Sequence, residues 1–195
     1  EALLGPEAME TLRRSHVAVF GLGGVGSWAA EALARGGVGR LTLVDFDTVS
    51  VTNINRQLYA LTSTLGRFKA EIAAERILDI CPVTDVFPRI MRYEAATREE
   101  LLGPRYDYIV DAIDLVSCKL DLIQTAMERG IPIISSMGTG NRLIGGTFQV
   151  TDIAKTRDDP LARVMRRELR QRGILHAHAL WALGEPAKPA EPEEE

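Results

Sequence analysis

The sequence has few cysteines and no long hydrophobic run, and each absence argues against a class of protein. Only two of its 195 residues are cysteine, Cys81 and Cys118, and they form neither a CxxC pair nor a metal-binding spacing. This argues against a disulfide-stabilised fold and makes a cytoplasmic location the expectation. No segment approaches the roughly 20 consecutive apolar residues that a membrane-spanning helix needs. The amino end lacks the basic and apolar regions of a signal peptide, so we expect no membrane partner.

Negative charge is concentrated at the carboxyl end of the chain. The net charge is −4, and residues 185–195 hold five acidic residues against one lysine, so the preceding residues carry no net charge. This Pro- and Glu-rich segment cannot bury a core and is predicted to be a mobile, solvated tail. With 46% hydrophobic residues in the whole chain, residues 1–184 are predicted to form one folded domain.

Apolar runs of strand length alternate with helical patterns along the chain. This alternation predicts βαβ units and therefore an α/β, Rossmann-like fold with a mostly parallel sheet flanked by helices. Strands are expected at residues 16–20, 41–45, 83–87, 108–112, 131–135 and 148–150, and helices at residues 6–14, 27–35, 66–80, 117–129 and 159–172.

A glycine-rich loop stands between the first predicted strand and the first long helix. Gly21, Gly23 and Gly26 form G-x-G-x-x-G, which in this context is typical of nucleotide binding. The glycines permit a tight turn, close approach of phosphates and close packing of helix on strand, and the start of the helix favours an anion. Asp45 ends the next strand, where a carboxylate accepts hydrogen bonds from ribose. A mere tight turn is the alternative, and these residues alone would favour NAD.

Other polar residues beside this loop favour ATP over NAD. Asn53 and Arg56 follow the second strand, Lys69 lies near the start of the long helix, and Asp114 follows the fourth strand. Residues at the carboxyl ends of parallel strands gather at one edge of the sheet. A triphosphate requires cations to neutralise its charge and an acid to hold Mg²⁺. The alternatives are surface charges for Arg56 and Lys69 and a helix cap for Asp114.

Together these motifs resemble the ubiquitin-activating-enzyme-like adenylyltransferases. The motifs are G-x-G-G-V-G-S, L-V-D-x-D, N-x-N-R-Q, a lysine on the following helix and D-A-I-D, and the match covers roughly residues 8–172. Residues 24–35, 51–57, 151–156 and 159–162 more specifically resemble the bacterial tRNA threonylcarbamoyladenosine dehydratases. This resemblance implies a homodimer that dehydrates and cyclises threonylcarbamoyladenosine in tRNA, with ATP adenylating the threonyl carboxylate.

The resemblance also implies a role for each candidate residue. Arg56, Lys69 and Asp114 form the implied catalytic set, with Asp114 holding Mg²⁺. The last predicted helix offers a basic face as a candidate contact for tRNA, for which a plain solvated face is the alternative. The implied nucleotide site comprises Gly21, Gly23, Gly24 and Gly26 for the phosphates, Asp45 for the ribose, and Asn53, Arg56 and Lys69 for the triphosphate, while the basic face comprises Arg163, Arg166, Arg167, Arg170 and Arg172.

The sequence departs from the family pattern at its ends and in its cysteines. Family members usually carry an arginine-containing segment before the first helix and a substrate-binding loop after the position of Glu195. The sequence shows neither, so either the two ends are missing from it or the protein is incomplete as an enzyme. Some relatives use a cysteine after the last predicted helix, but residues 175–181 contain none. A sulfur-carrier or cysteine-desulfurase partner is therefore not supported. Three alternatives stay open: an adenylyltransferase for a ubiquitin-like sulfur carrier, a non-catalytic nucleotide-binding module, and an NAD oxidoreductase.

Overall fold

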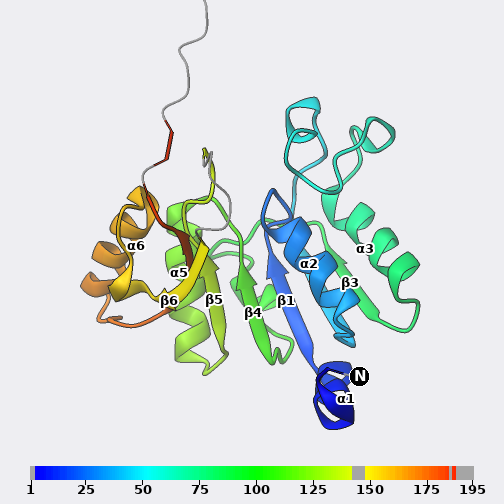
Figure 1. The fold of residues 1–195 in the computed structure, drawn as a ribbon, viewed down its shortest axis with the longest axis horizontal. Helices are drawn as coiled ribbons and strands as arrows, with labels where there is room; N and C mark the ends of the chain where they lie inside the picture. The colour runs from blue at the N-terminus through cyan, green and yellow to red at the C-terminus, as the bar shows by residue number, and fades with distance from the viewer. Residues whose placement is uncertain (1–2, 142–147, 185, 188–195) are drawn as a thin grey trace, which may run out of the picture. The chain divides into compact units, whose positions relative to one another are not determined.

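Strands and helices alternate along the chain, as the sequence predicts (Figure 1). The computed structural model describes residues 3–141, 148–184 and 186–187. The chain divides into two units, Glu1–Ile133 and Ile134–Glu195. The predicted domain over residues 1–184 stays a prediction, and most of the predicted tail over residues 185–195 lies outside the described residues. Among the described residues, no helix is long and apolar enough to cross a membrane.

The first unit contains four parallel strands in the order β3-β2-β1-β4. Because the strands are parallel, their carboxyl ends share one edge, and the connections that follow them meet there. In Figure 1, α2 and α3 lie in front of these strands. The elements of this unit are α1 (Gly5–Arg14), β1 (His16–Phe20), α2 (Gly26–Arg35), β2 (Arg40–Val44), η1 (Val51–Asn53), η2 (Thr62–Thr64), α3 (Lys69–Ile80), β3 (Asp85–Arg89), α4 (Arg98–Leu101), β4 (Tyr108–Asp111) and α5 (Val116–Glu128).

The core of the first unit lies between the central strands and helices α2 and α3. All five residues of β1 are buried, which is typical of a parallel strand covered on both faces. Val19 of β1, Leu43 of β2 and Ile77 of α3 belong to one cluster of buried apolar side chains. This packing places the start of α2 directly above the end of β1, where the glycine loop connects them.

The described residues of the second unit contain three strands, of which β5 and β7 are parallel and β6 and β7 are antiparallel. Strand β7 was not predicted, because its five residues carry little periodicity. In the structure Ala179 and Trp181 of this strand are buried. The elements of this unit are β5 (Ile133–Ser136), β6 (Phe148–Asp152), η3 (Ile153–Lys155), α6 (Pro160–Gln171) and β7 (His178–Ala182).

Two predicted elements in the first unit have boundaries that are wrong by two or three residues. The third strand begins at Asp85 rather than at Val83, whose side chain is exposed, because Asp85 donates to the carbonyl of Gly39 and pairs beside β2. Helix α3 begins at Lys69 rather than at Gly66, which has a positive φ of 79°. The structure therefore makes Lys69 the first residue of its helix, beside the connection that follows β2.

Candidate active site

The glycine loop makes a tight junction between β1 and α2. Gly21 has a φ of 86°, and a Cβ at this position would lie 2.6 Å from the carbonyl oxygen of Ala112. A Cβ at Gly26 would overlap the carbonyl oxygen of Gly21. The N-cap residue Val25 supplies no side-chain cap to α2, and the first turn contains no acidic residue. The first N–H groups of α2 are therefore suited to an anion.

Asp45 follows β2 directly and links this strand to the glycine loop. Its Oδ2 accepts a hydrogen bond of 2.7 Å from the N–H of Leu22, and its Oδ1 accepts one of 2.8 Å from the N–H of Asp47. Burial raises the pKa of the Asp45 carboxyl, while these two N–H groups and the charge of Lys69 oppose the rise. Each carboxylate oxygen has a further lone pair, so the bonds to the backbone leave capacity for a ribose hydroxyl.

Lys69 is a buried cation next to these carboxylates. Its side chain is 6% exposed, and its Nζ lies 3.0 Å from Oδ2 of Asp47. The alternative of an ordinary surface charge is therefore wrong for Lys69. Asp47 was quoted in the sequence motif but received no role there, and the structure shows that it orients the lysine.

Arg56 lies against the glycine loop from the connection that follows β2. Its Nη1 donates to the carbonyl of Thr52 at 2.8 Å and to Oδ1 of Asn55 at 2.9 Å. Its Cγ would lie 3.5 Å from a Cβ placed at Gly24. Unlike Lys69, Arg56 is exposed to solvent. The structure thus brings Arg56 to the loop, as predicted, and leaves its guanidinium accessible to a ligand.

Asn53 organises the turn that carries Arg56. Its Oδ1 accepts a hydrogen bond of 3.1 Å from the N–H of Ser50, and its carbonyl accepts from the N–H groups of Arg56 and Gln57. The side chain is buried. A direct role of Asn53 in holding phosphates stays a prediction, whereas its role in shaping this turn is structural.

Asp114 lies in the connection between β4 and α5. The side chain is exposed, and the residue that caps α5 is Leu115, without a side-chain hydrogen bond. The alternative of a helix cap is therefore wrong for Asp114. Ala112, in the same connection, donates its N–H to the carbonyl of Phe20 at 2.8 Å and faces Gly21. Asp114 thus lies two residues after Ala112, whose backbone contacts the glycine loop.

Ser27 joins the glycine loop to the segment that carries Arg56, a link that sequence reasoning missed. Its Oγ donates to the carbonyl of Gly23 at 2.6 Å and accepts from the N–H of Leu58 at 3.2 Å. The hydroxyl of Tyr59 donates to the carbonyl of Ser27 at 3.0 Å. The available signal was the serine that directly follows the third glycine of the motif. Ser27 has no exposed surface, so it acts by holding these two segments together.

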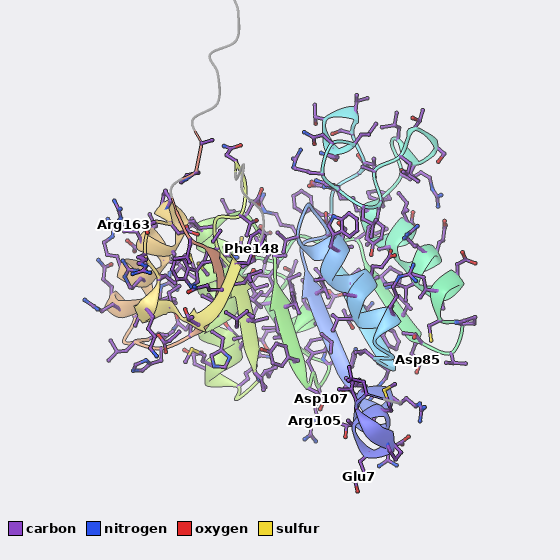
Figure 2. The ribbon with its side chains drawn as sticks, viewed as in Figure 1. Glu7, Asp85, Arg105, Asp107, Phe148 and Arg163 are labelled. Carbon is purple, nitrogen blue, oxygen red and sulfur yellow. The ribbon has the colours of Figure 1, made fainter. Side chains whose placement is uncertain are left out.

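The hollows of about 590 Å³ and about 370 Å³ in the first unit lie away from this site. The former is lined by residues such as Arg13, Arg40 and Asp85, and the latter by residues such as Arg105 and Asp107. Figure 2 shows Asp85, Arg105 and Asp107 near the amino ends of the strands. None of the predicted nucleotide-binding residues lines either hollow. The backbone and side-chain contacts above therefore place the candidate site at the carboxyl edge.

Comparisons with known proteins agree with the motifs. The model of the ThiF family matches residues 1–174. The chain is 49% identical to the tRNA threonylcarbamoyladenosine dehydratase of Bacillus subtilis (strain 168) over 174 residues, which cover 89% of the chain and 68% of that protein. It is 44% identical to the dehydratase of Escherichia coli (strain K12) over 171 residues, covering 86% of the chain and 63% of that protein. The chain thus spans about two thirds of the length of these relatives.

A solved structure shows the same fold. The crystal structure of the E. coli tRNA N6-threonylcarbamoyladenosine dehydratase in complex with ATP is 38% identical to the chain, with a TM-score of 0.92. The match covers 96% of the chain and 81% of that structure. The predicted α/β, Rossmann-like fold and the resemblance inferred from the motifs are both confirmed. The chain belongs to the ThiF family and groups within it with the tRNA threonylcarbamoyladenosine dehydratases.

Proposed function

We propose that the chain catalyses the ATP-dependent dehydration of threonylcarbamoyladenosine in tRNA, which closes the threonylcarbamoyl group into a ring. One observation carries the proposal: Asp45 and Arg56 contact the glycine loop, and Lys69 is buried against Asp47, in a chain that is 49% identical to such a dehydratase. An NAD site needs no buried lysine and adjacent arginine beside its pyrophosphate. The E. coli relative was crystallised with ATP, which supports ATP as the nucleotide here.

The reaction needs activation of a carboxylate that is itself a poor electrophile. A threonyl carboxylate oxygen attacks the α-phosphorus of ATP, and pyrophosphate leaves. The urea oxygen of the same substrate then attacks the acyl carbon, AMP leaves with the carboxylate oxygen, and a urea N–H gives up its proton. The nucleophile belongs to the substrate, so ring closure is intramolecular and is favoured by proximity. The enzyme contributes position and charge, and no cysteine is required.

Each residue of the site has a task in this scheme. The N–H groups of the glycine loop hold phosphate oxygens, and Asp45 accepts from the ribose. Arg56 and Lys69 neutralise charge that develops around the α-phosphate, and Asp47 orients Lys69. Because these groups are held in place before the nucleotide arrives, little reorganisation accompanies the reaction.

Asp114 is suited to hold Mg²⁺. It is an exposed carboxylate without a capping hydrogen bond, beside backbone that contacts the glycine loop. Carboxylate oxygens are the ligands that Mg²⁺ accepts, usually together with phosphate oxygens. The ion would neutralise phosphate charge when bound.

A homodimer is the proposed assembly, and tRNA is the proposed substrate. Trp28 is 55% exposed, and its Nε1 donates to the carbonyl of Arg56, so its ring borders the segment that also exposes Val51 and Ile54. Exposed apolar side chains that gather in this way are typical of a protein interface. On α6, the exposed Arg163 supports contact with tRNA phosphates (Figure 2).

The deciding experiment is incubation of the protein with ATP, Mg²⁺ and tRNA that bears threonylcarbamoyladenosine, followed by digestion and mass analysis of the nucleosides. We expect a mass loss equal to one water that requires ATP and yields AMP and pyrophosphate. Arg56→Ala is the site variant, and Arg67→Ala is its matched control, since Arg67 is an exposed arginine paired with Glu75. ATP binding without pyrophosphate release would favour a non-catalytic module. Pyrophosphate release that depends on a ubiquitin-like carrier instead of tRNA would favour the sulfur-carrier alternative.

A further inference from the structure

A fully buried ion pair lies beneath the connection that carries Asp114. The Nζ of Lys119, in the first turns of α5, lies 2.9 Å from Oδ2 of Asp111, the last residue of β4. Both side chains have 0% exposure. The short separation of unlike charges at a fully buried position makes this a strong electrostatic contact.

The same aspartate shapes the connection itself. Its Oδ1 accepts a hydrogen bond of 3.1 Å from the N–H of Ile113, and Asp111 is in register with Phe20, the last residue of β1. Ala112, which lies between Asp111 and Ile113, faces Gly21 of the glycine loop. One carboxylate therefore holds both the backbone that leads to Asp114 and the first turns of α5.

Stability alone is a poor explanation of such a pair. Removing two charges from water costs several kcal/mol per ion, and a buried pair is often matched or exceeded in stability by apolar side chains of similar volume. An ion pair is more directional than an apolar contact, because its two charged groups have one favourable arrangement. At this position that geometry sets where the β4–α5 connection lies against the glycine loop.

We propose that Asp111 and Lys119 are positioning residues that hold residues 112–114 against the glycine loop, so that the Asp114 carboxylate faces the phosphates and Mg²⁺ of the bound nucleotide. The pair touches neither ligand. It acts through the backbone of the connection, and this role rests on the nucleotide site of the proposed function.

The test replaces the pair by neutral side chains of similar size. Asp111→Asn or Lys119→Met alone breaks the ion pair while the other charge stays buried, and we expect a lowered denaturation midpoint. The double variant D111N/K119M removes both charges, and we expect its midpoint to return towards that of the wild type. The Mg²⁺ concentration that half-saturates ATP binding, measured by calorimetry, should remain raised by about tenfold or more in the double variant.

A second ion pair on the same helix supplies the control. Arg98 contacts Asp121 of α5, which also accepts from the hydroxyl of Tyr93. The variant R98M/D121N should leave the Mg²⁺ dependence of ATP binding unchanged. A D111N/K119M protein with wild-type Mg²⁺ dependence would show that the pair is only structural and would overturn the proposal. If this variant does not fold, D111N/K119Q is measured under the same criterion.

The two proposals can fail separately. Calorimetry reports nucleotide and Mg²⁺ binding without tRNA or turnover. A wild-type protein that does not dehydrate its tRNA substrate, while D111N/K119M still raises the Mg²⁺ requirement, would overturn the dehydratase function and leave the positioning role intact. If the wild type dehydrates its tRNA substrate and D111N/K119M has the wild-type Mg²⁺ requirement, the dehydratase function stands and the positioning role is overturned.

Discussion

Arg56 and Lys69 have the same proposed task in different surroundings. Arg56 is exposed beside the glycine loop, whereas Lys69 is buried and paired with Asp47. We expect Arg56→Ala and Lys69→Ala each to lower ATP–pyrophosphate exchange by about 100-fold, as the loss of one preorganised charge-stabilising group does elsewhere. Arg67→Ala is the control, and exchange at the wild-type rate in both site variants would contradict the assignment.

His16 makes the stability of the first unit depend on pH. Burial, and then the charge of Arg40, lowers the pKa of His16 below its ordinary value of 6.5, and the ring lies 2.9 Å from the Thr42 hydroxyl. Below about pH 6.5 His16 is protonated in the unfolded chain, whereas in the folded chain its lowered pKa keeps it neutral to a lower pH. The free energy of unfolding should therefore fall from about pH 7.5 to about pH 5.5, where few carboxylates titrate. Urea midpoints across this range should change less in His16→Gln.

At the scale of elements, the tight junction of β1 and α2 depends on the absence of a Cβ atom at Gly26. A Cβ at Gly26 would overlap the carbonyl of Gly21, whereas a Cβ at Gly24 would meet only the Arg56 side chain at 3.5 Å. We expect Gly26→Ala to abolish ATP binding and to lower the melting temperature strongly, because backbone must move. Gly24→Ala should melt near the wild-type temperature. Equal melting temperatures would show that the junction is less tight than the structure indicates.

Helix α6 begins at Pro160, one residue after its predicted start, and Asp159 is its capping residue. Oδ1 of Asp159 accepts a hydrogen bond of 2.9 Å from the N–H of Ala162, and the residue is 2% exposed. Asp159→Ala should lower the free energy of unfolding by about 1 kcal/mol or more, the ordinary cost of a lost cap. Denaturant titration measures the change. Arg157→Ala, at an exposed position two residues earlier, is the comparison.

At the scale of the whole molecule, the structure separates the arginines of α6 into two kinds. Arg163, Arg167 and Arg170 are exposed, whereas Arg166 donates to the carbonyl and hydroxyl of Thr156. If the exposed arginines contact tRNA phosphates, replacing one of them by glutamine should reduce the slope of log affinity against log salt by about one. Arg166→Gln should instead lower stability. An unchanged slope in every exposed variant would favour a plain solvated face.

The elements that the sequence predicts well are those with strong local signals. Five consecutive apolar or weakly polar residues followed by the glycine pattern predict β1 and the start of α2 to within one residue. Strand β7 was missed, because five residues between turns carry little periodicity and this strand is defined by its partners β5 and β6. The start of α3 was misplaced because the carbonyl of Asp47, distant in sequence, accepts from the N–H of Lys69.

The sequence by itself determined the fold class, the glycine loop and the identity of the charged residues at the ends of strands, because these depend on local patterns and on the edge shared by parallel strands. Only the tertiary structure decided that Lys69 is buried against Asp47, that Asn53 shapes a turn, and that Asp111 and Lys119 form a buried pair. Burial and pairing depend on which side chains folding brings together. No local pattern specifies that, so surface charge and buried ion pair look alike in a sequence.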